Sequence, residues 1–531
     1  MTQNTNPARG MRDFLPADIR RREYVISIIK DVYQKYGFEP LETPAVENIE
    51  TLMGKYGEEG NQLIFKILKR GEGAATGEAD LALRYDLTVP TARVVAEYKD
   101  KLPRIFKRYQ IQPVWRADRP ARGRFREFYQ CDVDVFGAKS MVVEAELCAA
   151  VNEVLQRLGF NNFIIRVNHR GVLTGVLAAA GVHSNKHTEA LVALDKFDKI
   201  GREGVAKEFA ERGILDEVGN KLLALFESFI SGDTKDVFSE NQKEKLFALQ
   251  NEIRQTEILY EKASEQLKKR KEHLGEPRRL SYWKTIAEGI SEDDAWVMPS
   301  INAIKEEKAQ FKRTDEALVG VRNESILLKL KIFIGENEVG KKGIEDLERV
   351  LEVSFNSKVK SKIRIDPSLA RGLSYYTGTI FEINVPDLAG SIGGGGRYDN
   401  LIGMFSGEEI PACGFSLGLE RIIVVMTERG MFPEHLTRAA ADVLVTVWNE
   451  ETIADSLELA NELRAQGLRV SVYPEADKLG KQLKYAASIG VAAVAIVGDD
   501  ERANNMVTIK HLETGTQETI ARDRLHTDLK I

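Results

Sequence analysis

The sequence from Arg371 to Glu382 reads Arg-Gly-Leu-Ser-Tyr-Tyr-Thr-Gly-Thr-Ile-Phe-Glu. It places one cation and two adjacent phenols in a run that is typical of a strand. Because a buried tyrosine hydroxyl needs a hydrogen-bond partner, Arg371, Tyr375 and Tyr376 predict a polar pocket for a small anionic or zwitterionic ligand. A tyrosine pair in a strand can also be ordinary packing at the edge of a core, and the neighbouring Arg371 is what favours the pocket.

A second polar cluster lies in the stretch from Arg104 to Phe136, which predicts a long antiparallel hairpin. In its second arm, apolar side chains at 129, 131, 133 and 135 alternate with the polar Gln130, Asp132 and Asp134. Successive side chains of a strand point to opposite faces, so one face serves a core and the other a polar ligand. An exposed, highly charged hairpin is the alternative, and the long spacing from Arg116 to Gln130 argues against it.

The run Leu83-Arg-Tyr-Asp-Leu-Thr-Val-Pro90 offers a carboxylate and a hydroxyl two residues apart. In extended chain Asp86 and Thr88 share a face, and the pair suits an ammonium group. Asp86 can instead end a strand and cap the next helix. Without further information, the sequence favours the role of Asp86 as a helix cap over a role in binding an ammonium group.

Glycines mark two further segments. Gly393-Gly-Gly-Gly-Arg-Tyr-Asp399 allows a ligand to approach the backbone closely, although a glycine run is more often a loop. In Ala412-Cys-Gly-Phe-Ser-Leu-Gly-Leu-Glu-Arg-Ile-Ile423, two glycines precede Arg421, which opens a predicted helix. A helix N-terminus with an arginine favours bound phosphate.

Together these segments resemble the active site of the histidyl-tRNA synthetases, which are class II aminoacyl-tRNA synthetases. The doublet Tyr-Tyr after Arg-Gly-Leu is a signature of that family, the hairpin resembles class II motif 2, and the segment 412–423 resembles motif 3. A predicted helix over residues 17–36 is followed by extended chain, in which Pro44 takes the place of the motif 1 proline at the dimer interface.

The resemblance implies roles for individual residues. It implies that histidine binds to Asp86, Thr88, Arg116, Gln130, Asp134, Arg371, Tyr375 and Tyr376. It implies that ATP binds to Arg116, Asp118, Arg124, Phe128 and Arg421. Catalysis is assigned to Arg116 and Arg371 at the α-phosphate, with Mg²⁺ accompanying ATP and no protein metal ligand.

Two residues depart from the family pattern. Asp86 stands where many bacterial members have glutamate, which gives a shorter reach to the same ammonium group. Ser374 stands where aspartate is commoner, which leaves open any supporting role of that acid.

The pattern along the chain predicts an α+β fold with an insertion and a separate C-terminal domain. Residues 1–170 and 361–435 resemble the catalytic domain, an antiparallel sheet with flanking helices, and residues 171–360 read as an inserted helical domain. From residue 440 to 531, strands alternate with helices, which predicts a small α/β domain that closes on a helix near Thr519–Leu525. This part is similar to the anticodon-binding domain of the family.

Composition and motifs argue against a membrane-spanning protein, a secreted protein and a P-loop ATPase. The chain has 531 residues, a formal net charge of -6, and no apolar run near the ~18 residues that cross a bilayer. Its first residues lack a secretory signal, and three cysteines without metal-ligand spacing favour a reducing cytoplasm. Nine basic side chains and one acid lie between Lys101 and Arg126, and no P-loop sequence is present.

The expected function is that of a histidine–tRNA ligase. Histidine would react with ATP to give histidyl-adenylate and pyrophosphate, and tRNA(His) would then accept the histidyl group at its 3′ end. A homodimer without membrane contact is implied. The alternative is a catalytically silent paralogue that regulates histidine biosynthesis; such paralogues typically lack the C-terminal domain and lose active-site residues.

Overall fold

The computed structural model describes residues 4–71, 73, 76–194, 196–231, 246–247, 251–259, 261–262, 265, 298–354, 359–370, 375–386, 388, 390–433, 436 and 440–525. Contacts divide the chain into two units, one of Met1–Phe14 with Arg22–Met431 and one of Leu15–Arg21 with Phe432–Ile531. Within the described residues, no helix is long and apolar enough to cross a membrane.

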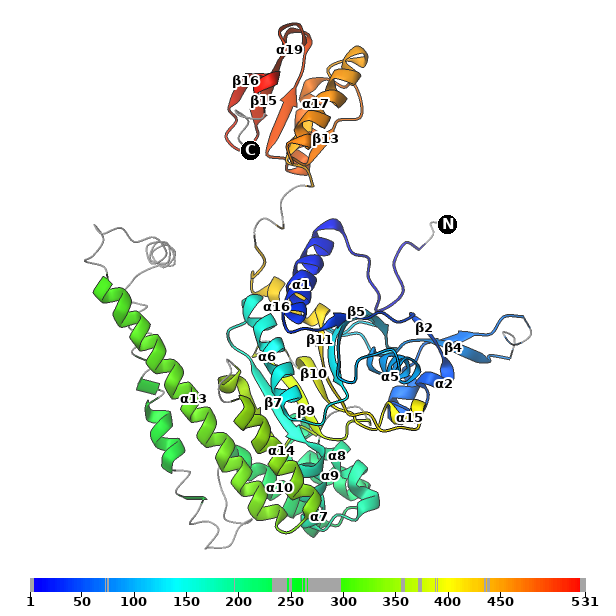
Figure 1. The fold of residues 1–531 in the computed structure, drawn as a ribbon, viewed down its shortest axis with the longest axis vertical. Helices are drawn as coiled ribbons and strands as arrows, with labels where there is room; N and C mark the ends of the chain where they lie inside the picture. Colours follow the sequence, from blue (N-terminus) through cyan, green and yellow to red (C-terminus); the bar gives the residue numbers. More distant parts are fainter. Residues whose placement is uncertain are drawn as a thin grey trace. The chain divides into compact units, whose positions relative to one another are not determined.

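The larger unit is built on an eight-stranded, largely antiparallel sheet (Figure 1). Only the two outermost pairs, β1 with β5 and β7 with β8, are parallel. In spatial order the strands are β1 (Glu39–Pro40), β5 (Phe106–Trp115), β6 (Glu127–Phe136), β11 (Ala412–Gly418), β10 (Ser391–Arg397), β9 (Thr379–Asn384), β7 (Ile164–His169) and β8 (Ile363–Ile365). The class II expectation of an antiparallel sheet with flanking helices is confirmed.

The predicted hairpin is formed by β5 and β6, and its two faces differ as expected. The odd-numbered positions Cys131, Val133 and Val135 face an apolar layer in which Tyr33 of α1 donates to the Cys131 carbonyl. The opposite face carries Gln130, Asp132 and Asp134, and it too is buried. The helices around the sheet include α1 (Pro16–Lys35), α5 (Thr88–Glu97), α6 (Val142–Arg157) and α16 (Leu419–Glu428).

The glycine run 393–396 is part of β10, not a loop. It pairs with β9 on one side and β11 on the other. A Cβ on Gly395 would lie 2.1 Å from the carbonyl oxygen of Gly414, so the close approach of these two strands needs glycine. The loop interpretation was wrong because pairing on both edges satisfies the backbone of the run.

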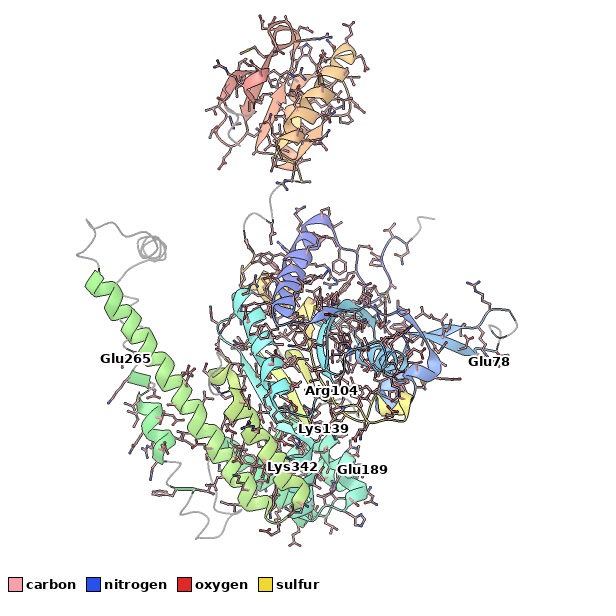
Figure 2. All side chains as sticks on the ribbon, in the orientation of Figure 1. Glu78, Arg104, Lys139, Glu189, Glu265 and Lys342 are labelled. Carbon is pink, nitrogen blue, oxygen red and sulfur yellow. The ribbon has the colours of Figure 1, made fainter. Side chains whose placement is uncertain are left out.

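A small antiparallel sheet projects from the larger unit. It consists of β2 (Val46–Asn48), β4 (Ala79–Leu83) and β3 (Lys66–Leu68), with α2 (Ile49–Leu52) and α3 (Gly57–Gln62) nearby in sequence. Figure 2 labels Glu78 at the outer end of this projection, where it forms an ion pair of 3.1 Å with Lys69.

The described residues between β7 and β8 are mostly helical, as the sequence of this region indicated. These helices gather at the edge of the sheet that carries β7 and β8, and α14 packs on α7 and α6 (Figure 1). They are α7 (Arg170–Ala180), α8 (His187–Leu194), α9 (Phe197–Glu211), α10 (Asp216–Ser231), α13 (Met298–Ile334) and α14 (Glu338–Ser354).

The smaller unit has a mixed five-stranded sheet. Its strands are β13 (Val470–Val472), β12 (Val443–Val445), β14 (Ala493–Ile496), β15 (Met506–His511) and β16 (Gln517–Ala521), in that spatial order. Its helices are α17 (Ile453–Ala465), α18 (Leu479–Ile489) and α19 (Asp499–Asn504). Val443 packs with Leu459 of α17, whereas Leu444 packs with Ala486 of α18, so the two helices cover opposite faces.

The predicted closing helix at Thr519–Leu525 was wrong. Residues 517–521 form β16, which pairs antiparallel with β15, and only Arg522–Arg524 make a short 3-10 turn. The Thr519 and Ile520 side chains suit a strand, and the open edge of β15 supplies the backbone partners that a short isolated helix would lack.

A buried ion pair ties α6 to the sheet. Arg397 of β10 donates to both carboxylate oxygens of Glu144, at 2.7 and 2.8 Å, and Thr379 donates to the same carboxylate at 2.9 Å. Both partners are almost completely inaccessible to solvent. Their desolvation is offset only while the whole set of hydrogen bonds is kept.

We expect Glu144→Ala to lower the free energy of unfolding by about 3–5 kcal/mol, because it leaves the Arg397 cation buried without its partner. Glu153→Ala on the same helix is the matched control. It removes the exposed Lys35–Glu153 pair and should cost less than about 1 kcal/mol. Urea denaturation of both variants measures the difference, and equal losses would contradict the assignment.

Candidate active site

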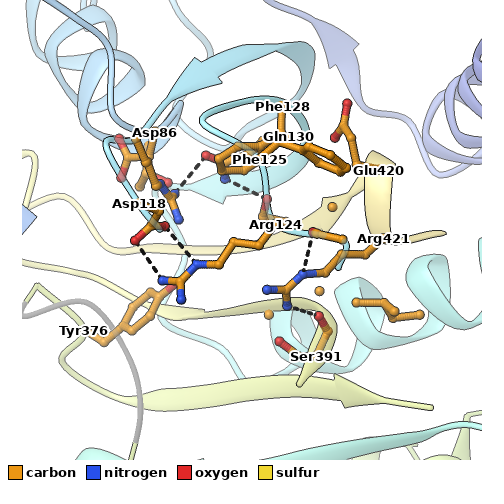
Figure 3. Close-up of a pocket in the computed structure, with 18 of the residues that line it drawn as sticks. Asp86, Asp118, Arg124, Phe125, Phe128, Gln130, Tyr376, Ser391, Glu420 and Arg421 are labelled. Atoms are coloured by element: carbon orange, nitrogen blue, oxygen red, sulfur yellow. Dashed lines mark hydrogen bonds and ion pairs between the residues drawn. The ribbon is translucent and has the colours of Figure 1, made fainter. Parts of the chain in front are cut away.

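A pocket of about 280 Å³ opens on the polar face of the large sheet (Figure 3). It is bounded by β6, β10 and β11, by the N-termini of α5 and α16, and by the loop 117–126 between β5 and β6. The structure brings ten of the predicted side chains to its wall: Asp86, Thr88, Arg116, Asp118, Arg124, Phe128, Gln130, Tyr375, Tyr376 and Arg421. Asp134 is not among the lining residues, and Arg371 and Ser374 lie outside the described residues.

One end of the pocket is anionic. The Asp86 carboxylate accepts hydrogen bonds from the Tyr56 and Tyr375 hydroxyls at 2.9 and 3.0 Å. It also accepts from the amide of Val89, in the first turn of α5, at 3.1 Å, and it lines the pocket. Burial raises the pKa of Asp86, and the hydrogen bonds and Arg116 oppose that rise. A hydrogen bond to the first turn of the next helix and a place in the pocket wall are therefore both observed, and ammonium binding by Asp86 stays a prediction.

Arg116 spans the floor of the pocket. Its Nε donates to the Tyr85 carbonyl at 3.0 Å and its Nη2 to Oε1 of Gln130 at 3.2 Å. The guanidinium carbon lies 5.1 Å from the ring centre of Phe128. Gln130 in turn donates to Oγ of Ser416 at 2.8 Å, which fixes its amide. Arg116 also lines the cavity, and a planar guanidinium there suits a planar anion.

Behind Gln130 lies a buried layer of acids. Asp134 forms an ion pair of 2.8 Å with Arg108 and accepts a hydrogen bond from the Tyr398 hydroxyl. A Cβ on Gly414 would come within 1.8 Å of an Asp134 oxygen, so that glycine makes room for the carboxylate. Asp134 therefore stands one layer behind the wall on which the sequence had placed it.

Asp132 shares this buried layer, next to Arg108 and Asp134. Its nearest polar partners are Gln130, at 3.4 Å, and Ser416. Burial, together with the charge of the nearby Asp134, raises the pKa of Asp132 to about 7. Arg108 opposes this rise. Burial likewise raises the pKa of Asp134, with Arg108 opposing it.

The other end of the pocket is cationic. Arg124 forms a two-pronged ion pair with Asp118, at 2.8 and 3.1 Å, across the loop (Figure 3). Arg421 donates to the Gly123 carbonyl at 3.3 Å and to the Ser391 carbonyl. Figure 3 shows both guanidinium groups facing the cavity. This end suits a chain of phosphates.

Sequence reasoning missed Glu420 and Phe125. Glu420 lines the pocket, pairs with Arg22 at 2.8 Å and accepts from the Tyr129 amide at 3.0 Å. Burial raises its pKa and Arg22 lowers it. A glutamate at a helix start is usually exposed, so no sequence signal separated Glu420 from a surface acid.

The pocket can hold a zwitterion beside a nucleotide. Asp86 suits an ammonium group, Arg116 a carboxylate or phosphate, Phe128 an aromatic base, and Arg421 a phosphate tail. Over the described part of the chain, no group of three or more His, Cys, Asp or Glu side chains could hold a metal ion.

Comparisons with known proteins identify the family. A histidyl-tRNA synthetase family model matches residues 10–286 and 298–422, and an anticodon-binding-domain model matches residues 442–530. A histidine–tRNA ligase of Gloeobacter violaceus is 38% identical over 96% of this chain and 95% of its own. One of Christiangramia forsetii is 34% identical over the full length of both. The crystal structure of histidyl-tRNA synthetase from Nostoc sp. PCC 7120 matches with a TM-score of 0.67 and 27% identity, over 99% of this chain and 98% of its own.

We expect Asp132→Asn to stabilise the fold increasingly as pH rises from about 4 to about 7. In that window the unfolded chain has lost the Asp132 proton, whereas the folded protein keeps it because the pKa is about 7. The free energy of unfolding of the wild type therefore falls as pH rises through this window. The variant has no carboxyl group at this position, so its free energy of unfolding does not fall for this reason. The free energy of unfolding of the variant, relative to that of the wild type, should rise by roughly 2–4 kcal/mol across the window and stay constant above it.

Urea denaturation at several pH values from 4 to 8 measures this difference. Asp100→Asn, at an exposed aspartate, is the control and should show no such trend. A difference between Asp132→Asn and wild type that stays constant with pH would show that Asp132 is not held protonated.

Proposed function

The chain belongs to the histidyl-tRNA synthetase family and acts as a histidine–tRNA ligase, and we propose that the pocket around Arg116 is the site of both of its steps. The observation that carries this proposal is the joint presence of Asp86, Arg116 and Arg421 in one cavity. These three groups match the ammonium, carboxylate and phosphate charges of histidine and ATP.

In the first step, a histidine carboxylate oxygen attacks the ATP α-phosphorus and pyrophosphate leaves. Asp86 and Thr88 hold the histidine ammonium group, while Tyr375, Tyr376 and Gln130 surround the imidazole. Such a hydrogen-bonding pocket rejects analogues that lack the matching ring nitrogens. Asp134 contributes from the layer behind Gln130, through its charge and its bond to Tyr398.

Arg116 and Arg371 stabilise the negative charge that develops at the α-phosphate. No protein nucleophile is needed, because positioning and preorganised positive charge lower the barrier. The role of Arg371 rests on the family segment Arg-Gly-Leu-x-Tyr-Tyr, which this sequence retains. At the position x it has Ser374, where the family more often has aspartate.

ATP occupies the cationic end. Phe128 lies under the adenine ring, Asp118 meets the adenine amino group, and Arg124 with Arg421 binds the phosphate tail. Because Asp118 and Arg124 pair with each other in this structure, nucleotide binding must exchange that ion pair for contacts with the adenine and the phosphates.

Mg²⁺ fits the site as a companion of ATP. The pocket carboxylates of Asp118 and Glu420 are already engaged by Arg124 and Arg22, so phosphate oxygens supply most of the ligands of the ion. When bound, Mg²⁺ neutralises phosphate charge.

In the second step, the terminal ribose hydroxyl of tRNA(His) attacks the carbonyl carbon of the histidyl-adenylate, an ester forms, and AMP leaves. We assign the tRNA anticodon to residues 440–531, catalysis to residues 1–170 and 361–435, and the inserted helical domain to residues 171–360. A cytoplasmic homodimer, with the extended chain around Pro44 at the dimer interface, completes the proposal.

Charging of total tRNA with each of the twenty amino acids, in the presence of ATP and Mg²⁺, tests the function. We expect charging with histidine alone. A folded protein that charges nothing would instead favour the silent regulatory paralogue, which the names of the relatives do not support.

We expect Arg116→Ala to slow histidine-dependent ATP–pyrophosphate exchange by roughly 10²–10³-fold, because it removes a charge aimed at the α-phosphate. Arg119→Ala is the matched control: it lies on the same loop, is exposed and does not line the pocket. Its exchange rate should equal that of the wild type. If Arg116→Ala kept the wild-type rate, the proposed site would be wrong.

A further inference from the structure

Arginine and aromatic side chains alternate in a ladder that runs from the N-terminal segment to the pocket. In order its members are Phe125, Arg12, Phe14, Arg22 and Tyr129. The guanidinium carbon of Arg12 lies 3.4 Å from the ring centre of Phe125 and 4.9 Å from that of Phe14. That of Arg22 lies 4.1 Å from Phe14 and 4.8 Å from Tyr129. All four distances are within the range of attractive cation–π contacts.

The two ends of the ladder lie on different elements of the larger unit. Tyr129 belongs to β6 in the centre of the sheet, and Arg22 is fixed by its buried ion pair with Glu420. Phe125, at the opposite end, lies in the loop 117–126 and lines the pocket. The ladder therefore connects a loop of the pocket wall to a strand of the sheet.

Main-chain contacts place the N-terminal segment against the same loop. The Arg126 amide donates to the Gly10 carbonyl at 2.8 Å, and its guanidinium donates to the Arg9 carbonyl at 3.4 Å. Gly10 has φ +85°, and a Cβ there would lie 2.9 Å from side-chain atoms of Arg126 and Pro120. Glycine is what lets the segment lie this close.

We propose that Arg12 is a positioning residue for ATP, which holds the loop 117–126 in its binding position by stacking on Phe125. The inference rests on the proposed function of the pocket. Asp118 and Arg124, which we assign to ATP, are carried by this loop. The histidine end has other supports, since Asp86 is held by Tyr56 and by α5. Loss of the stack should therefore affect ATP and spare histidine.

The test is steady-state histidine-dependent ATP–pyrophosphate exchange by the full-length chain. We expect Arg12→Ala to raise the KM for ATP by about tenfold, the equivalent of about 1.4 kcal/mol. The KM for histidine should stay within about twofold of wild type. Arg12→Lys keeps the charge but lacks the planar group that stacks, so its KM for ATP should lie between those of wild type and Arg12→Ala.

Arg9→Ala is the matched control, because Arg9 offers the loop a main-chain carbonyl that the substitution leaves in place. Both KM values should remain at wild type. If Arg12→Ala does not fold, as judged by its thermal unfolding midpoint, Phe14→Leu breaks the ladder at the next member and should show the same selective rise in the KM for ATP.

Two results would overturn the inference: a wild-type KM for ATP in Arg12→Ala, or an equal rise in both KM values. The second result would mean that the segment only stabilises the fold. A wild-type chain that shows no exchange with histidine would instead refute the proposed function, so the two failures are distinguishable.

Discussion

The need to bury a row of polar side chains on β6 governs the larger unit. Gln130, Asp132 and Asp134 point into the protein from the centre of the sheet. Burying carboxylates is costly unless partners replace water. The neighbouring elements supply those partners: Arg108 from β5, Ser416 from β11, and Tyr398 from just beyond β10. The pocket opens where this layer meets Arg116 and the two adjacent tyrosines.

The two faces of the large sheet differ in polarity. The face under α1 and α6 is close-packed and apolar, and its buried charge is neutralised locally by the Arg397–Glu144 pair. The opposite face keeps its polar groups for ligands and is thinned by glycines. Gly414 clears space for Asp134, and Gly396 lies under the ring of Tyr376. The Arg397–Glu144 pair and the pocket thus lie on opposite sides of the same strands.

The loop 117–126 is one of the parts of the pocket wall that lie outside the sheet. Its inner side presents Asp118 and Arg124 to the nucleotide end of the pocket, and its outer side receives the N-terminal segment. A loop that must both admit a substrate and hold charges in place needs support from outside itself. The stack of Arg12 on Phe125 provides it without filling the cavity.

The sequence by itself determined many of the elements and ten of the residues that line the pocket. Alternation predicted the two faces of β6, and the Tyr-Tyr and motif 2 segments named side chains that do converge, such as Tyr376 and Arg116. Periodicity states which way a side chain points on its own element. It does not state which element lies opposite.

The tertiary structure therefore decided the rest. It placed Asp134 behind the wall, because Arg108 and Tyr398 meet it there. It turned the 393–396 glycines into a strand, because β9 and β11 pair with both of their edges. It joined Arg22 to Glu420 across 398 residues of sequence. Such partners are chosen by how the strands and helices assemble, and no local spacing encodes that choice.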